Sequence, residues 1–161
     1  MIRLFVYGSL RIGGGNERLL PAGPRQPALT GPGWDLFEFA GGAYPVMVAT
    51  GGPRSVTGDL VTLDIDSAEW ADVEHLERGA GYHLTPIHAT VLVPRWDWDG
   101  KRTSPRTRTM VPADADPVFT FAWFHADDDG IGRHVQDGDW IAHLARQRVA
   151  YESAFYRDAR L

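Results

Sequence analysis

Short segments in which apolar and polar residues alternate run through most of the chain, and glycine or proline closes most of them. Alternation with a period of two predicts strands that bury one face. We expect strands over residues 2–7, 34–39, 45–50, 55–63, 84–93 and 118–125. Residues 21–33, rich in Pro and Gly, are expected to form a loop. Six or so strands with few helices predict a small, mostly antiparallel closed sheet.

The period changes to that of a helix over residues 66–78. Asp66, followed three residues later by Glu69, gives this segment a capping-box start. A second helix is expected at about 139–158, and residues 16–20 form at most a short helix capped by Asn16.

Composition bounds the number of domains and the function classes. A chain of 161 residues, 43% of them hydrophobic, suits one domain, residues 1–161. The formal net charge of -5 gives no reason to expect nucleic acid, and no apolar stretch approaches the length of a membrane span. No signal-peptide pattern opens the chain and cysteine is absent, which is compatible with the cytoplasm, so we expect a cytoplasmic protein without disulfides or Cys-ligated zinc. The oligomeric state is left open.

The segment 94–117 is long for a connection inside a compact domain. It carries two tryptophans and several basic residues, so a lid over a site and a poorly ordered loop both remain open. Contact with nucleic acid is disfavoured by the acidic balance of the chain and by the lack of a recognition motif.

The first expected strand runs into a glycine-rich turn at Gly8, Ser9 and Leu10. Their N–H groups lie beyond the last expected strand partner and are free to bind a ligand. Gly8 lacks a Cβ, so its backbone can adopt a positive φ and a ligand can approach closely. Consecutive N–H groups in such a turn form an anion-binding nest that suits a carboxylate. A flexible surface turn is the alternative.

Two phosphate-binding motifs fail on the same stretch. The P-loop pattern needs Lys-Ser/Thr after its second glycine, where Gly14-Gly15 stands. The dinucleotide pattern needs a third glycine where Arg18 stands, and no βαβ alternation follows.

The sequence gives no sign of a metal site. The six histidines show no metal-ligand spacing. Residues 127–130 resemble a calcium loop only superficially and fit a hairpin turn better.

Glu77 is the candidate for proton transfer. Trp70, Val73 and Glu77 are spaced i, i+3 and i+7, which places one carboxylate on the apolar face of the expected helix. Desolvation raises the pKa of a buried carboxylate toward neutrality, as a group that must accept and donate a proton requires. Alternatively, Glu77 reaches solvent at the helix end and pairs with a nearby arginine.

The motif Val6-Tyr7-Gly8-Ser9-Leu10-Arg11 resembles the signature of the gamma-glutamylcyclotransferase-like family, which includes the AIG2-like proteins. Further segments follow in the order and at about the spacing of that family: Tyr44-Pro45, Gly58-Asp59-Leu60, Glu74-His75-Leu76-Glu77, Tyr82 and Ala122-Trp123-Phe124. The resemblance implies an α+β fold, a small mixed and mostly antiparallel β-barrel with flanking helices.

The resemblance also implies a reaction and a site. The α-amine of a γ-glutamyl amine or γ-glutamyl amino acid attacks its own γ-carbonyl, which closes 5-oxoproline and releases the amine. Glu77 is then the catalytic acid/base. The residues implied to hold the small-molecule γ-glutamyl substrate are Tyr7, Gly8, Ser9, Leu10 and Tyr82. The turn N–H groups could bind the α-carboxylate of the substrate or the developing oxyanion, and the sequence leaves both open. No metal or cofactor is implied.

Three positions depart from the family pattern and leave the substrate open. Arg78 stands where glycine is usual, Leu84 where arginine is common, and His125 near a position often held by tyrosine. Two other functions remain: removal of a γ-glutamyl group from a protected amine in a biosynthetic pathway, and a non-catalytic barrel that binds a small acidic metabolite or a protein partner.

Overall fold

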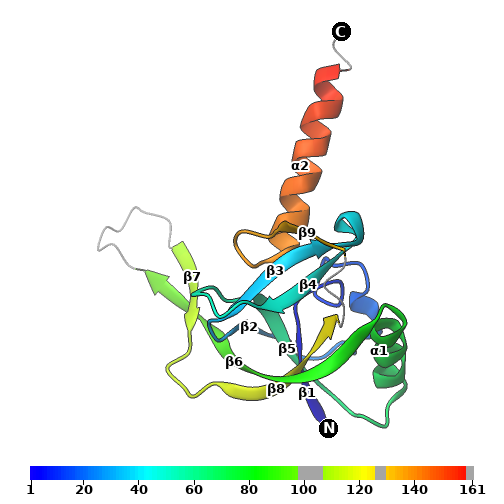
Figure 1. Ribbon diagram of the computed structural model, residues 1–161. Helices are drawn as coiled ribbons and strands as arrows, with labels where there is room; N and C mark the ends of the chain where they lie inside the picture. Colours follow the sequence, from blue (N-terminus) through cyan, green and yellow to red (C-terminus); the bar gives the residue numbers. More distant parts are fainter. Residues whose placement is uncertain (98–106, 126–129, 159–161) are drawn as a thin grey trace.

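Five strands close into a barrel in the computed structural model, which describes residues 1–97, 107–125 and 130–158. They are β1 (Ile2–Val6), β2 (Gln26–Thr30), β5 (Thr57–Leu63), β6 (Tyr82–Asp97) and β8 (Val118–His125). Their order is β2-β5-β1-β8-β6, and pairing of β2 with β6 closes the circle. β1 and β8 run parallel, whereas the other pairs are antiparallel. The expected mixed, mostly antiparallel barrel is confirmed (Figure 1).

A second, three-stranded sheet accompanies the barrel. Its strands are β3 (Trp34–Phe39), β4 (Tyr44–Ala49) and β9 (Ile131–His134), in the order β4-β3-β9. The helical elements are α1 (Ala68–Gly79), α2 (Trp140–Asp158) and two short 3-10 helices, η1 (Glu17–Leu19) and η2 (Ala40–Gly42). In Figure 1, α1 lies against one side of the barrel, and α2 runs away from the body. Among the described helices, none combines the length and the apolar character needed to cross a membrane.

The alternating pattern of β1 builds two apolar clusters. Leu4 and Val6 belong to a cluster on the side of α1, together with the fully buried Val73 of that helix. Phe5, between them in the sequence, belongs to a second cluster that includes Trp140 of α2. Because successive residues of a strand point to opposite faces, one short segment supplies both sides of the barrel wall.

The segment 21–33 contains a strand that the sequence pattern did not predict. β2 occupies Gln26–Thr30, so the expectation of a loop is wrong there. Pro27 pairs only with β5, because the described pairing with β6 begins at Ala28. Proline is tolerated where a strand position is not hydrogen-bonded on both sides, so it did not exclude the strand.

The segment 94–117 is also more regular than expected. β6 continues to Asp97, and β7 (Thr107–Pro112) pairs with it antiparallel, from Leu92 opposite Pro112 to Asp97 opposite Thr107. The alternative of a poorly ordered loop is therefore wrong for these two strands, whereas residues 98–106 lie outside the described residues. Both figures show the described part of this hairpin on the side of the barrel away from α1.

The helix caps differ from the sequence expectation. Ser67, not Asp66, caps α1, and its Oγ accepts a hydrogen bond from the Trp70 N–H at 3.1 Å. Asn16 precedes η1 without a side-chain capping bond. Its amide Nδ2 instead donates to Ser9 Oγ at 3.0 Å, because the chain folds back on the turn that follows β1.

Candidate active site

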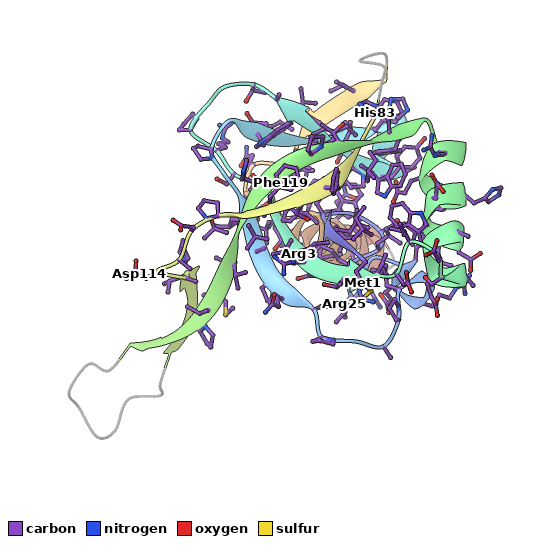
Figure 2. All side chains as sticks on the ribbon, turned by 90° about the horizontal axis from the view of Figure 1, so that it is seen from below. Met1, Arg3, Arg25, His83, Asp114 and Phe119 are labelled. Carbon is purple, nitrogen blue, oxygen red and sulfur yellow. The ribbon has the colours of Figure 1, made fainter. Side chains whose placement is uncertain are left out.

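A cavity of about 220 Å³ lies where the end of β1, the start of β4 and the last turn of α1 meet. Its lining includes all six residues that the sequence singled out: Tyr7, Gly8, Ser9, Leu10, Glu77 and Tyr82. The fold therefore brings the glycine turn and the helix carboxylate to one space. Figure 2 shows α1 along the side of the barrel.

In the turn at residues 8–10, the carbonyl groups accept hydrogen bonds from other parts of the chain, whereas the N–H groups donate none to the described residues. The three carbonyl oxygens accept, in chain order, from the Arg11 N–H at 3.1 Å, the Asn16 N–H at 2.9 Å and the Arg25 guanidinium at 2.8 Å. Within the described part of the chain, no acceptor takes the N–H groups of these three residues. Consecutive unbonded N–H groups attract an anion, so this turn is a candidate carboxylate site.

Gly8 is needed because the Pro45 ring leaves no space for a side chain, and not because of its φ. A Cβ at Gly8 would lie 2.8 Å from Pro45 Cγ, too close for any other residue without movement of the proline. Gly8 does not have a positive φ, so that expectation is wrong; the positive values near the turn belong to Gly13 (85°) and Gly15 (99°). The tight fit fixes the turn against the start of β4.

Glu77 lies half-buried in the last turn of α1, where it lines the cavity. No hydrogen bond or ion pair reaches its carboxylate from the residues that the structure describes. The adjacent Arg78 pairs instead with Glu74, at 2.8 Å. Burial raises the pKa of Glu77 from the usual 4.5 to about 7. Near neutral pH this carboxyl group can therefore both accept and donate a proton.

Two tyrosines form neutral walls of the cavity. The Tyr7 hydroxyl donates to the Trp123 carbonyl at 2.6 Å, and the Tyr82 hydroxyl donates to the Pro45 carbonyl at 2.6 Å. Burial raises the pKa of both phenols above its ordinary value, and the nearby Glu77 carboxylate raises it further. Both side chains stay protonated at neutral pH, and their hydroxyls already serve backbone acceptors.

Several lining residues were not predicted as site residues. Asn16, Tyr44, Pro45, Leu76 and Trp123 also face the cavity. Tyr44, Pro45, Leu76 and Trp123 stand inside segments of the family resemblance, which was the signal available for them. Asn16 carried no such signal, because a capping role was the natural interpretation of an Asn before a short helix. The buried Trp123 Nε1–H has no hydrogen-bond partner among the described residues.

The three departures from the family pattern lie around the site, not in the lining. The Arg78 guanidinium is 6.0 Å from the centre of the Trp123 ring. Leu84 is partly buried in the cluster that packs beneath α1. The His125 ring lies 5.2 Å from the Tyr82 ring and 4.2 Å from the Phe39 ring, centroid to centroid.

Candidate metal ligands do not converge in the described residues. No group of three or more His, Asp or Glu side chains there could hold a metal ion. His134 Nε2 lies 3.0 Å from Asp35 Oδ1, and His143 Nε2 lies 2.8 Å from Glu38 Oε1, so these histidines have carboxylate partners. Residues 127–129 of the superficially calcium-like segment lie outside the described residues.

Solved structures share this fold at low sequence identity. An uncharacterized protein from Pyrococcus horikoshii, PH0828, is 16% identical, with 92% of this chain and 97% of that one covered and a TM-score of 0.60. YkqA from Bacillus subtilis is 18% identical over 92% of this chain, which spans only 42% of YkqA, with a TM-score of 0.61. An AIG2-like protein from Mus musculus is 19% identical, with 83% and 86% covered and a TM-score of 0.59. At these identities the likeness establishes the fold alone.

Comparison at the sequence level identifies the family. No curated protein matches the chain. The profile of the family described as gamma-glutamyl cyclotransferase, AIG2-like, matches residues 4–142. That range contains the turn, the helix carboxylate and the tyrosines of the cavity. The chain belongs to the AIG2-like gamma-glutamyl cyclotransferase family.

Proposed function

We propose that the protein is a gamma-glutamylcyclotransferase-like enzyme that converts a γ-glutamyl amine or γ-glutamyl amino acid to 5-oxoproline and the free amine. The observation that carries this proposal is the Glu77 carboxyl group, which lines the cavity without a partner among the described residues and has a pKa raised to about 7. Family membership suggests the reaction class.

Glu77 is proposed to transfer one proton across the reacting amide. The α-amine of the substrate attacks the γ-carbonyl carbon, and Glu77 accepts the proton that the attacking nitrogen loses. The bond from the γ-carbon to the leaving nitrogen then breaks, and Glu77 returns the proton to that nitrogen. Because nucleophile and electrophile belong to one molecule, holding the substrate folded supplies much of the rate.

The turn at residues 8–10 is proposed to hold the α-carboxylate of the substrate. No Lys, Arg or His is among the residues that line the cavity, all of which belong to the described part of the chain. The open N–H groups of the turn are therefore the donors suited to a fixed negative charge. Tyr7 and Tyr82 are buried and form walls of the cavity, and they are proposed to limit the access of water to the reacting amide.

A panel of γ-glutamyl compounds tests the proposal. The protein is incubated with γ-glutamyl amines and γ-glutamyl amino acids, and mass spectrometry detects 5-oxoproline and the released amine. The preferred leaving group separates an enzyme of γ-glutamyl amino acids from one that deprotects an amine. No 5-oxoproline from any compound would favour a non-catalytic binding barrel.

The same assay on Glu77→Gln assigns the proton transfer. The amide keeps the size of the side chain but cannot take up a proton, so turnover should fall by about 10²–10⁴-fold. Glu74→Gln is the matched control, because Glu74 lies on the same helix and pairs on the surface with Arg78. Near-normal turnover by a folded Glu77→Gln variant would remove Glu77 from the mechanism.

A further inference from the structure

The Arg11 side chain, which follows the turn at residues 8–10, contacts two carboxylates and one backbone carbonyl. Its Nε lies 3.3 Å from Asp59 Oδ2 in β5, and its Nη1 lies 2.8 Å from Asp139 Oδ1 before α2. Nη1 also lies 3.4 Å from the Thr57 carbonyl. The side chains of Arg11 and Asp59 are each only 12% exposed, and Arg11 does not line the cavity. Direct contact between this guanidinium and a ligand in the cavity is therefore not its role.

Asp139 joins the same cation to the start of α2. Its Oδ1 accepts from the Ile141 N–H at 3.0 Å and from the Ala142 N–H at 3.2 Å, which is the geometry of a helix N-cap. One carboxylate oxygen therefore serves both the helix end and Arg11. The first turn of α2 also approaches Gly13, which follows the turn at residues 8–10, since a Cβ at Gly13 would lie 3.6 Å from Ile141 Cγ2.

The backbone of Arg11 belongs to the turn itself. Its N–H donates to the Gly8 carbonyl and its carbonyl accepts from the Gly14 N–H at 2.9 Å. A guanidinium fixed by two carboxylates from distant parts of the chain therefore anchors one end of the N–H array. A largely buried ion pair is weak evidence for stability, because desolvation offsets much of the attraction, but it can fix a geometry.

We propose that Arg11 is a positioning residue, which holds the anion-binding turn in place through Asp59 and Asp139 and so ties substrate binding to the N-terminus of α2. This rests on the proposed function of the turn as the site for the α-carboxylate. Removal of the charge leaves Glu77 and its surroundings intact, so binding should weaken while proton transfer continues.

Steady-state kinetics of Arg11→Met test the proposal on a substrate that the panel identifies. We expect KM to rise by about tenfold, with kcat and its pH profile close to those of the original protein. Arg146→Met is the matched control, because Arg146 of α2 forms an exposed pair with Asp137, which precedes the helix, and does not contact the turn. Its KM should not change. An unchanged KM for Arg11→Met, or losses of activity that only follow the folded fraction, would overturn the proposal.

Asp139→Asn provides a second test that does not depend on the stability of Arg11→Met. Asparagine caps a helix as well as aspartate does, so α2 keeps its N-cap while Arg11 loses one charged partner. We expect a smaller rise in KM, in the same direction.

Amide exchange measured by NMR without substrate separates this proposal from the proposed function. The Asn16 N–H donates to the Ser9 carbonyl and the Gly14 N–H to the Arg11 carbonyl. Both amides should exchange about tenfold faster in Arg11→Met than in Arg146→Met. If no substrate is turned over, the proposed function fails, whereas exchange still tests the anchoring by Arg11. Unchanged exchange would overturn the anchoring.

Discussion

The carboxyl group of Glu77 occupies a position that folding alone would not favour. It is desolvated in the cavity, and no described residue donates a hydrogen bond to it. Leu76 of α1, Ala80 directly after this helix and Trp123 of β8 line the same cavity and are largely apolar. A charge kept in such a place opposes stability, which is typical of groups retained for function.

The pH dependence of stability follows from this pKa. Because the pKa of Glu77 is about 7 in the folded protein and the usual 4.5 when unfolded, the folded state binds more protons between these values. The contribution of Glu77 to stability is therefore fully present below pH 4.5 and is lost as the pH rises through 7. We expect Glu77→Gln to melt close to the original protein at pH 4.5 and above it at pH 8. A lower melting temperature at pH 8 would instead indicate a structural ion pair.

Two substitutions at Ser9 separate the contribution of its backbone N–H from that of its hydroxyl in ligand binding. Ser9→Pro removes an open N–H group and restricts φ, whereas Ser9→Ala keeps the N–H and loses only the contact of Oγ with Asn16. We expect Ser9→Pro to raise KM by about tenfold or more and Ser9→Ala to have a much smaller effect. Steady-state kinetics of both variants decide the point. Equal effects would assign binding to the hydroxyl, and a fall in kcat at constant KM would assign the turn to the developing oxyanion.

At the scale of elements, α1 and the turn after β1 are held to the barrel in different ways. Ser67 caps α1, and Val73 and Trp70 pack toward the barrel, where the Trp70 ring lies 6.1 Å from the Trp123 ring, centroid to centroid. This packing sets which face of the helix carries Glu77 to the cavity. The turn depends instead on polar contacts and on the close fit of Gly8 to Pro45.

The β6–β7 hairpin is expected to be dispensable for folding. β7 pairs only with β6 among the described strands, and the barrel closes through β2 and β6 without it. Replacement of residues 95–109 by an Asn-Gly turn should therefore leave the melting temperature within a few degrees of the original, measured by circular dichroism.

Kinetics of the same shortened variant test the lid interpretation of this segment. The described strands of the hairpin lie on the side of the barrel away from α1, which carries Glu77 (Figure 2). We expect unchanged KM and kcat on every substrate of the panel. An altered substrate preference in a folded variant would show that the segment reaches the site.

At the scale of the whole molecule, the site exists because the barrel closes. β1 lies between β5 and β8, so its end emerges beside Trp123 of β8. The second sheet brings Pro45 against Gly8, and the chain between β5 and β6 returns as α1 to bring Glu77 to the same cavity as the turn. Each of these contacts joins segments that are distant in sequence.

Local patterns in the sequence determined much of this arrangement. Alternation located β1, β3, β4, β5 and β8, and the helical period located α1. The same period placed Glu77 in line with Val73, which the structure buries. Such features depend on residues a few positions apart, so the sequence displays them directly.

Tertiary structure alone decided the features that depend on distant partners. β2 forms in a Pro- and Gly-rich segment because β5 and β6 supply hydrogen-bonding edges on its two sides. Gly8 is needed because Pro45 approaches it, and Arg11 finds its carboxylates 48 and 128 positions away. No local period or propensity encodes such contacts, because they arise only when the barrel closes and brings the strands together.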